Sequence, residues 1–297
     1  MRIRALLACC AAGALTLGGV PGTARAVTGA AARTVDPPAI PGEALMGHLR
    51  EFQRIADANG GNRAHGRPGF KASLDYVKAT LEAAGYQPSV HSFSHQGATG
   101  WNIVAEWPHG DAGQTLVIGA HLDGVTAGPG INDNASGTAA LLENALLVAK
   151  NDLRPRKRLR FAWWGAEELG LIGSAKYVSG LSADQRRQIA LYLNFDMVGV
   201  RNLAKWRIYK ESPEVAAVWK KYFAGRNIPT EDYQASSDQL SFADARIAVS
   251  GFGGRSDDRC YHKACDTTTN VAADTMSVSA NAIAAVSWEL AGVNVRR

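Results

Sequence analysis

The chain has 297 residues, of which 46% are hydrophobic and 20% are charged, and its formal net charge is +5. This composition is typical of a globular protein and excludes a disordered or low-complexity chain. The dense basic run over residues 154–158 falls in a short connection between a predicted helix and a predicted strand. An isolated basic loop is not the clustered basic face that binds nucleic acid, so we expect no nucleic-acid partner.

The N-terminus has the pattern of a secretory signal peptide. Arg2 and Arg4 precede an apolar run from Ala5 to Val20, and Ala24-Arg25-Ala26 supplies a small-residue cleavage site. A membrane anchor is the alternative, but the run is short for a span of about 20 residues. We therefore expect a signal peptide over residues 1–26 and a secreted protein that has no membrane attachment after cleavage. Removing these residues takes away three arginines and lowers the formal charge from +5 to +2.

Two cysteines remain in the mature chain, Cys260 and Cys265. In an exported protein, two cysteines this close favour a disulfide bond. A zinc–thiolate site is the alternative, but the mature chain has no second cysteine pair to complete one. The disulfide would fix the backbone that carries Tyr261 and His262.

The elements predicted from the sequence alternate between helices and strands. Residues 27–41 are rich in Ala, Thr and Pro, and we expect a flexible segment there, followed by a single catalytic domain over residues 42–297. Apolar residues at helical spacing predict helices, and short apolar runs predict strands. In chain order we expect helices over 43–58 and 70–84, strands over 87–93, 101–107 and 115–120, a helix over 135–149, a strand over 159–164, a helix over 171–179, strands over 189–195 and 206–209, a helix over 213–224, a strand over 247–250 and a helix over 273–291.

This alternation predicts the fold class. Strands followed by helices form an α/β domain, here a three-layer sandwich with a mostly parallel central sheet and helices on both faces. The strand over 115–120 is a nearly continuous apolar run, which is typical of a strand that is covered on both faces.

Polar side chains stand just past the carboxyl ends of three predicted strands, and another lies in a loop that leads into a helix. They are His121, Asp133, Glu167, Glu168 and Asp196. In open α/β sheets, ligands bind at the carboxyl ends of the strands, so we expect these side chains to meet. Imidazole and carboxylate ligands suit zinc. The adjacent acids Glu167 and Glu168 can divide the work, since one can bind a metal while the other moves a proton.

Five motifs resemble the secreted bacterial two-zinc leucyl aminopeptidase family, over the chain from about residue 45 to its end. In chain order they are Ala120–Asp123, Gly130–Gly137, Trp164–Gly170, Asn194–Gly199 and Cys260–His262. The resemblance implies a zinc-exopeptidase type of fold, two zinc ions per chain and peptide substrates with a free N-terminus. It also implies a cis peptide bond between Asp133 and Asn134.

The same resemblance assigns the metal ligands. Asp133 would bridge the two zinc ions. His121 and Asp196 would bind one of them, and Glu168 and His262 would bind the other. Bound zinc lowers the pKa of water from about 15.7 toward 7, and two ions can hold a bridging hydroxide and polarise the carbonyl group of the substrate.

Residues around these ligands complete the expected site. Glu167 would be the general base that passes the proton of the water to the leaving amine. By the resemblance, Tyr261 would donate a hydrogen bond to the carbonyl oxygen as it becomes an oxyanion. Asp123, two residues after His121, is expected to orient that imidazole. Met197 and Phe252 are candidates for lining the substrate pocket, with ordinary core packing as the alternative.

The chain also departs from the family pattern. Ser236 falls where some members carry an arginine that helps to hold the substrate, and the stretch from Phe252 to Cys260 is short, which could leave the pocket more open. Ser277 and Asn281 fall where some relatives carry two calcium-binding acids, so calcium is not expected. We expect a monomer, and the sequence does not specify the preferred N-terminal residue of the substrate.

Three other functions are weighed against an aminopeptidase. A related carboxypeptidase would carry an inserted lid domain, and the interval from Asp196 to His262 is too short for one. A relative of glutaminyl cyclase would need only one zinc, whereas both ligand sets are present here. A non-catalytic binding ectodomain on the same fold should have lost ligands, and none is missing.

Overall fold

The computed structural model describes residues 36–254 and 258–293. The predicted signal peptide and residues 27–35 lie outside these described residues, as do three residues of the short stretch before Cys260. The described residues form one sheet of eight strands with helices on both sides. No helix within 36–254 or 258–293 is long and apolar enough to span a membrane.

The strands of the sheet are β1 (Ser89–His95), β2 (Ala98–Glu106), β3 (Asp111–His121), β4 (Lys157–Trp164), β5 (Ile189–Asp196), β6 (Trp206–Tyr209), β7 (Thr230–Tyr233) and β8 (Val249–Gly253). The α-helices are α1 (Gly42–Ala58), α2 (Pro68–Ala83), α3 (Gly137–Lys150), α4 (Ile172–Gly180), α5 (Ala183–Gln188), α6 (Pro213–Ala224), α7 (Gln239–Asp244) and α8 (Ala273–Ala291). Short helical turns cover Ile131–Ser136, Glu167–Leu169 and Thr268–Asn270.

The strand order of the sheet is β1-β2-β4-β3-β5-β8-β6-β7. The central strands β4, β3, β5 and β8 run parallel to one another. The β1–β2 hairpin joins this centre antiparallel through β2, and β6 pairs antiparallel with β8 on the other side. The edge strand β7 pairs parallel with β6. The predicted α/β fold is therefore confirmed, with a mixed sheet whose four central strands are parallel.

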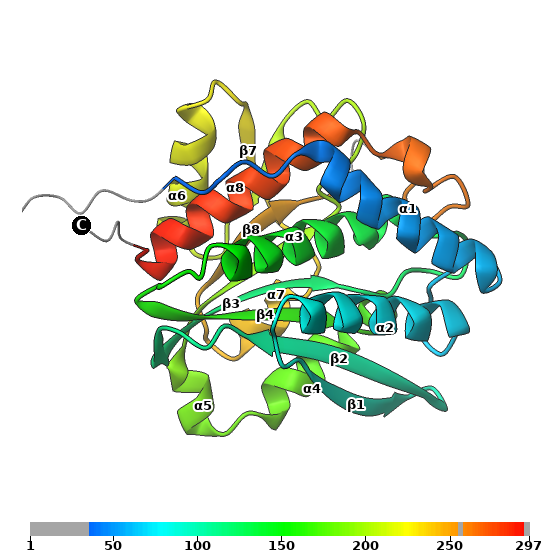
Figure 1. Cartoon of the computed structure of the whole chain (residues 1–297), viewed down its shortest axis with the longest axis horizontal. Helices are drawn as coiled ribbons and strands as arrows, with labels where there is room; N and C mark the ends of the chain where they lie inside the picture. The colour runs from blue at the N-terminus through cyan, green and yellow to red at the C-terminus, as the bar shows by residue number, and fades with distance from the viewer. Residues whose placement is uncertain (1–35, 255–257, 294–297) are drawn as a thin grey trace, which may run out of the picture. The chain divides into compact units, whose positions relative to one another are not determined.

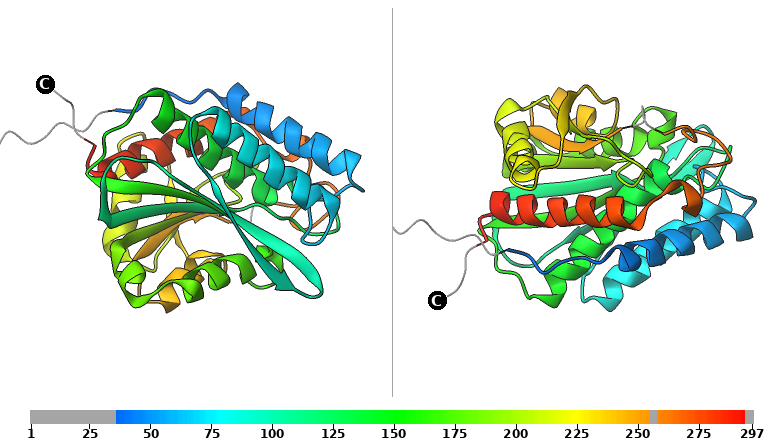
Figure 2. Two further views of the ribbon diagram at one scale, coloured as in Figure 1. Left: turned by 60° about the horizontal axis from the view of Figure 1, so that its bottom comes forward. Right: turned by 90° about the horizontal axis from the view of Figure 1, so that it is seen from above.

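Helices cover both faces of this sheet, as Figures 1 and 2 show. Helices α1, α2, α3, α6 and α8 bury one large core against one face, and α4 and α7 bury a smaller core against the other. Side chains alternate between the faces along each strand. In β4, for example, Trp163 enters the large core and Trp164 enters the small one, and both are completely buried. The tryptophan pair therefore packs the sheet.

The long elements lie where the sequence predicts them, with ends shifted by up to a few residues. The predictions for β6, α6 and α8 have the observed bounds. The structure adds three short elements that were not predicted: α5, β7 and α7. Helix α5 has no buried residue and depends on a capping box between Ser182 and Gln185, so it has no apolar periodicity to detect.

The segment before α1 is packed where it enters the described part of the chain. Ile40 is only 2% exposed, and its backbone exchanges hydrogen bonds with the side chain of Asn281 in α8 (2.9 Å each). Ser277, one turn earlier in α8, donates a further bond to the Ile40 carbonyl oxygen (2.9 Å). The expected flexibility of residues 27–41 thus does not extend to Ile40. Both polar side chains at the positions considered for calcium instead hold this segment.

Candidate active site

Three parallel strands end side by side at one edge of the sheet. His121 is the last residue of β3 and pairs in register with Trp164, the last residue of β4. Glu167 and Glu168 follow in the next helical turn, and Asp196 ends β5. Because the strands run in the same direction, their carboxyl ends bring the predicted side chains to one place, as the sequence analysis expected.

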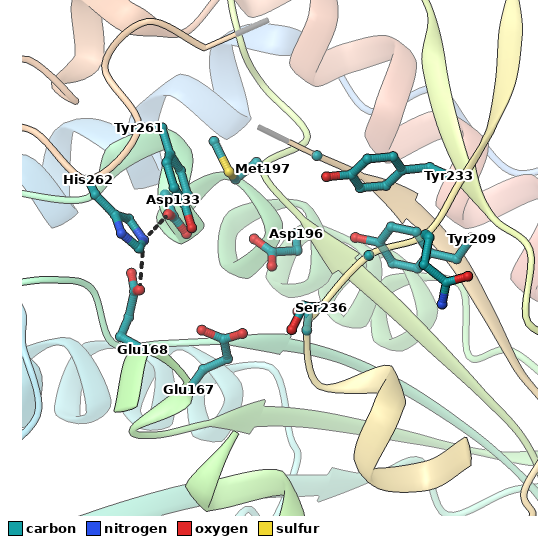
Figure 3. Close-up of a pocket in the computed structure, with 14 residues that line it drawn as sticks. Asp133, Glu167, Glu168, Asp196, Met197, Tyr209, Tyr233, Ser236, Tyr261 and His262 are labelled. Carbon is teal, nitrogen blue, oxygen red and sulfur yellow. Dashed lines mark ion pairs between the residues drawn. The ribbon is translucent and has the colours of Figure 1, made fainter. Parts of the chain in front are cut away.

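The carboxylate of Asp133 lies between two groups of side chains, and Figure 3 shows it between His262 and Asp196. Its Oδ1 is 3.3 Å from His121 Nε2, which is itself 3.4 Å from Asp196 Oδ1. Its Oδ2 is 3.1 Å from His262 Nε2, which is 2.8 Å from Glu168 Oε2. The two oxygens of Asp133 therefore face two separate imidazole–carboxylate pairs.

The chemistry of these side chains fits divalent metal ions. His121 Nε2, Glu168 Oε1 and Asp196 Oδ1 are buried and have no hydrogen-bond partner among the described residues. Buried polar atoms are normally hydrogen-bonded, and orphaned ligand atoms that converge are what a metal site requires. The ligand atoms of His121, Asp133 and Glu168 lie within 4.8 Å of one another, as do those of His121, Glu167 and Asp196. Imidazole and carboxylate donors in this mixture suit zinc.

Burial and neighbouring charges shift the pKa values in the metal-free site. Burial raises the pKa of Glu168 to about 7. It also raises the pKa of Glu167 well above the ordinary value, and the nearby carboxylate of Asp196 adds to this shift. Burial alone would raise the pKa of Asp133, but the imidazoles of His121 and His262 hold it at about 2. The Asp133 carboxylate therefore stays anionic, while Glu167 is suited to accept a proton.

Several site residues have unusual backbone angles. Ala166, Met197 and His262 have φ angles of +56° although none is glycine. Each lies at or next to a proposed site residue, and such conformations are found mostly where the surrounding structure enforces them for function. The peptide bond between Asp133 and Asn134 is cis, as the resemblance implied.

Two asparagines fix the loop that carries Asp133. The side chain of Asn134 donates to the Phe195 carbonyl oxygen (2.9 Å) and accepts from the Met197 backbone N–H (3.1 Å). The side chain of Asn132 accepts from the Gly199 backbone N–H (3.1 Å). The loop is therefore tied to the end of β5, the strand that presents Asp196.

Asp123 contacts the His121 imidazole, the residue that it is expected to orient, and it contacts the two-glutamate turn as well. The His121 Nδ1 lies 3.1 Å from the backbone carbonyl oxygen of Asp123 and 3.8 Å from its carboxylate. The carboxylate instead accepts hydrogen bonds from the backbone N–H groups of Glu167 (3.0 Å) and Glu168 (3.4 Å). Asp123 thus contacts the imidazole through its backbone and holds the two-glutamate turn through its side chain.

Arg63 is a residue of the site region that the sequence analysis missed. It lies between α1 and α2 and is completely buried. Its guanidinium donates to three backbone carbonyl oxygens, those of Leu122 (2.5 Å), Pro129 (2.8 Å) and Gly130 (2.6 Å). These carbonyls belong to the loops that follow His121 and precede Asp133. No motif could reveal this role, because a side chain that binds remote carbonyl groups leaves no pattern in its own segment.

Asp266 holds the Asp133 loop from the other side. Its carboxylate accepts from the backbone N–H groups of Asn132 (2.8 Å) and Asp133 (3.0 Å). Asp266 directly follows Cys265, which forms the predicted disulfide with Cys260. The disulfide loop therefore carries Tyr261 and His262, and it is followed directly by Asp266, which binds the Asp133 loop. The only feature of the sequence that could indicate this role of Asp266 is its position next to Cys265, and that is a weak signal.

A pocket of about 270 Å³ opens beside these side chains. Figure 3 shows Glu168 and His262 at one end of it and Tyr209 and Tyr233 at the other. Met197 and Ser236 line this pocket, and so does Tyr261, whose ring stacks on His262 with centroids 3.7 Å apart. Tyr209 and Tyr233 were missed because they come from β6 and β7, away from the recognised motifs.

Phe252 does not line this pocket. It is completely buried, and its ring packs edge-to-face on Phe195 (5.0 Å between centroids) and Trp219 (5.2 Å). In the parallel pairing of β5 with β8, Phe252 stands opposite Phe195. The expectation that Phe252 lines the pocket is therefore wrong, because the strand alternation turns its side chain into the core.

The fold and the site together define a class of protein. Imidazole and carboxylate side chains surround one central carboxylate at the carboxyl ends of parallel strands. This arrangement is typical of a metal-dependent hydrolase on an α/β scaffold. Comparison with known proteins specifies the family.

The sequence matches peptidase family M28 over residues 102–287. Leupeptin-inactivating enzyme 1 of Streptomyces exfoliatus is 43% identical over 311 aligned residues, which cover 97% of this chain and 70% of that protein. The structure of BSAP, a zinc aminopeptidase from Bacillus subtilis, is 26% identical with a TM-score of 0.61, and the match covers 66% of this chain and 51% of that one. An aminopeptidase from Aneurinibacillus sp. strain AM-1 has the same fold, with a TM-score of 0.75 at 17% identity over 85% of this chain and 94% of its own.

The chain belongs to peptidase family M28, and it is a metallo-aminopeptidase of that family of hydrolases. It spans about half the length of BSAP and 70% of the length of the leupeptin-inactivating enzyme. The match to the family leaves out α1, α2 and β1, so Arg63 lies outside the matched residues.

Proposed function

We propose that this protein is a secreted aminopeptidase that holds two zinc ions and removes N-terminal residues from peptides. The two ions would share Asp133, with His121 and Asp196 completing one site and Glu168 and His262 the other. The observation that carries the proposal is the division of the Asp133 carboxylate between two imidazole–carboxylate pairs. Secretion rests on the signal-peptide pattern of residues 1–26.

When bound, the zinc ions would make water a stronger nucleophile at neutral pH and polarise the carbonyl group of the scissile peptide bond. The residues of the chain would do the rest. Glu167 would accept the proton of the attacking water and deliver it to the nitrogen of the leaving amine. Tyr261 would donate a hydrogen bond to the carbonyl oxygen as that oxygen gains negative charge. Asp123 would keep the Glu167 turn in place through the hydrogen bonds to its backbone.

A free N-terminal ammonium group would bind at the pocket side of the site. Glu167 and Asp196 both line the pocket, and their carboxylates lie between Asp133 and the two tyrosines (Figure 3). An ammonium group placed there gains charge-assisted hydrogen bonds from both acids. A blocked N-terminus would lose them and leave a carboxylate unpaired in a buried site. This is the physical reason for expecting an aminopeptidase rather than an endopeptidase.

Hydrolysis of aminoacyl-anilides tests this proposal. We expect the purified zinc-loaded protein to cleave free aminoacyl-anilides and to leave the N-acetylated forms intact, over a panel of side chains that also identifies the preferred residue. Chelation should abolish the activity, and added zinc should restore it. Metal analysis should find two zinc ions per active chain. Cleavage of neither anilide by the zinc-loaded protein would contradict the proposal, and a stoichiometry of one would favour a glutaminyl-cyclase-like site.

A further inference from the structure

A second hollow adjoins the catalytic pocket on the far side of Glu168. Its volume is about 430 Å³, larger than that of the pocket. Glu168 lines both, so the two hollows meet at this side chain. One wall of this groove is the segment 64–67 between α1 and α2, and another is the segment 124–126 that follows β3. The turn between β1 and β2 closes it, since a Cβ placed on Gly66 would lie 2.8 Å from the Cβ of Ala98.

The position of the groove follows the direction that a peptide must take. An N-terminal residue whose amine lies at Glu167 and Asp196 has no residue before it, so only its side chain needs the space toward Tyr209 and Tyr233 (Figure 3). The rest of the substrate must leave on the opposite side of the scissile bond. Glu168 stands at that side, and the groove begins there.

Two side chains give the groove its binding character. Leu169, next to Glu168, is 39% exposed, and Val90 is the only other large hydrophobic residue exposed in the described part of the chain. Arg67 is the single lysine or arginine among the described residues that line the groove. It is exposed, and its guanidinium makes no salt bridge or side-chain hydrogen bond with any residue in 36–254 or 258–293.

These charges complement those of a short peptide. The catalytic pocket presents four carboxylates, from Asp133, Glu167, Glu168 and Asp196, to the end of the substrate that carries the ammonium group. The groove is also lined by the carboxylates of Asp123 and Glu168, but Asp123 accepts hydrogen bonds from the backbone N–H groups of Glu167 and Glu168 and Glu168 stands at the pocket end. Toward its other end the groove presents Arg67, which is unpaired among the described residues. A guanidinium binds a carboxylate well, because its fork of N–H donors matches the two oxygens.

We propose that this groove binds the residues on the carboxyl side of the scissile bond, and that Arg67 pairs with a carboxylate there. The favoured substrates are then short peptides that carry a free ammonium group at one end and a carboxylate within reach of Arg67. That carboxylate is either the C-terminus or an acidic side chain. The proposal rests on the proposed aminopeptidase function and adds a substrate class to it.

Matched pairs of peptides test the groove. The peptides Xaa-Gly, Xaa-Gly-Gly and Xaa-Gly-Gly-Gly, where Xaa is the residue preferred in the anilide panel, are compared as free acids and as C-terminal amides. We expect kcat/KM of zinc-loaded enzyme to be about twofold to fivefold higher for the acid at the length that reaches Arg67, through a lower KM, which is the size of an exposed ion pair. The ratio should approach one in Arg67→Met, fall below one in Arg67→Glu, and decline with added salt.

Controls separate the groove from general charge effects. Arg187→Met removes an exposed arginine of α5 that lines neither hollow, and it should leave the acid-to-amide ratio at the wild-type value. Xaa-Asp-Gly-amide and Xaa-Gly-Asp-amide show whether an acidic side chain can replace the C-terminus. An acid-to-amide ratio that is the same in wild type, Arg67→Met and Arg67→Glu at every length would overturn the proposal.

Measuring peptide binding without turnover distinguishes the test of the groove from the test of the proposed aminopeptidase activity. Calorimetry with zinc-loaded Glu167→Gln should give a Kd for the acid about twofold to fivefold below that for the amide, and Arg67→Met should remove the difference. Equal Kd values for the acid and the amide in zinc-loaded Glu167→Gln would overturn the proposal for the groove. Failure of the wild-type protein to cleave any free aminoacyl-anilide would instead overturn the proposed function.

Discussion

Glu167 and Glu168 are adjacent in the sequence, but their side chains have different neighbours and we assign them different roles. Glu168 lies 2.8 Å from His262 Nε2, whereas no imidazole comes that close to Glu167, whose Oε2 is 3.9 Å from His121 Nε2. We therefore expect Glu167→Gln to keep both zinc ions and to lower kcat by at least about 100-fold, the low end for general-base catalysis. Steady-state kinetics and metal analysis check this. Glu82→Gln, at an exposed position on α2, is the matched control. Near-wild-type kcat in Glu167→Gln would contradict the assignment.

Arg63 binds the two loops that carry the proposed metal ligands His121 and Asp133. Its burial lowers its pKa to about 10, so it stays charged at neutral pH. Removing it takes away the only donor among the described residues to the Leu122 and Pro129 carbonyl oxygens, whereas the Gly130 carbonyl oxygen still accepts from the Ala135 backbone N–H. Each unsatisfied buried carbonyl costs about 1–3 kcal/mol, so Arg63→Met should lower the free energy of unfolding by at least about 2 kcal/mol. Because the same loops present His121 and Asp133, the variant should also bind zinc more weakly.

Urea unfolding of the metal-free protein and chelator competition for zinc measure the two effects of Arg63→Met separately. Arg54→Met, at an exposed position on α1, removes the same charge without freeing a buried carbonyl. It should change neither quantity appreciably. Wild-type zinc affinity in folded Arg63→Met would show that the arginine supports the fold alone.

For single residues, the sequence predicts those that belong to a recognisable motif. It misses those whose side chains bind groups that are distant in the sequence. His121 and Asp196 stand at the ends of apolar runs, where the fold class itself places ligands. Arg63 is recognisable only once Leu122 and Gly130 are known to lie beside it. Phe252 shows the opposite failure, since proximity to a motif in the chain placed it wrongly in the pocket.

The segment from Cys260 to Cys265 behaves as one structural element. It carries Tyr261 and His262, and its disulfide precedes Asp266, which binds the Asp133 loop. Replacing both cysteines by serine should lower the free energy of unfolding by only about 2 kcal/mol, the value for so short a loop. The zinc site that depends on His262 should weaken more than the site at His121, because the constraint on the loop is lost.

Two-step zinc titration followed by calorimetry checks this prediction. One of the two binding steps should shift to a higher Kd more than the other in the double variant, and TCEP should reproduce that shift in the wild type. TCEP treatment of the double variant, which has no such disulfide to reduce, is the control. Unchanged affinity for both ions would show that Asp266 and the remaining contacts hold the loop without the disulfide.

Among elements, the sequence predicts those with a long apolar pattern. Helix α8 buries a face along 19 residues, and its predicted bounds are the observed ones. Strand β7 has four residues, none of them fully buried, and helix α7 has six. These short elements lack periodicity to detect, yet their ends supply Tyr233 and Asp238 beside the site. The side of the pocket that Tyr233 lines is therefore the side that the sequence predicts least well.

The scaffold as a whole gathers acidic groups into a buried region that metal ions would neutralise. Beneath the ligands lies Asp238, which is completely buried and whose carboxylate oxygens have no hydrogen-bond partner among the described residues. Burial raises the pKa of Asp238 to about 7, as it does for Glu168. Asp133 is the exception, with a pKa of about 2, because two imidazoles surround it.

The pH dependence of stability follows from these shifts. A carboxyl group whose pKa is raised in the folded state binds more protons folded than unfolded, so its contribution to stability is present below about pH 4 and is lost as the pH rises to about 7. Hydrogen bonds to Asp133 and Glu168 raise the pKa of His262 to about 10, and that contribution is lost between about pH 6.5 and 10. Asp133 acts in the opposite sense, because its contribution is lost only below about pH 4.

We therefore expect the metal-free protein to lose stability as the pH rises from about 4.5 to 7.5, by a few kcal/mol since one pKa unit corresponds to about 1.4 kcal/mol. Zinc should reverse this trend, because ligands must be deprotonated to bind it and its stabilising effect grows with pH. Thermal unfolding with and without zinc across this range measures both trends. Asp238→Asn removes a titrating group that is not a proposed ligand, so it should flatten the decline of the metal-free protein. A midpoint that rises with pH in the metal-free wild type would show that the acidic groups are not the source of the instability that zinc relieves.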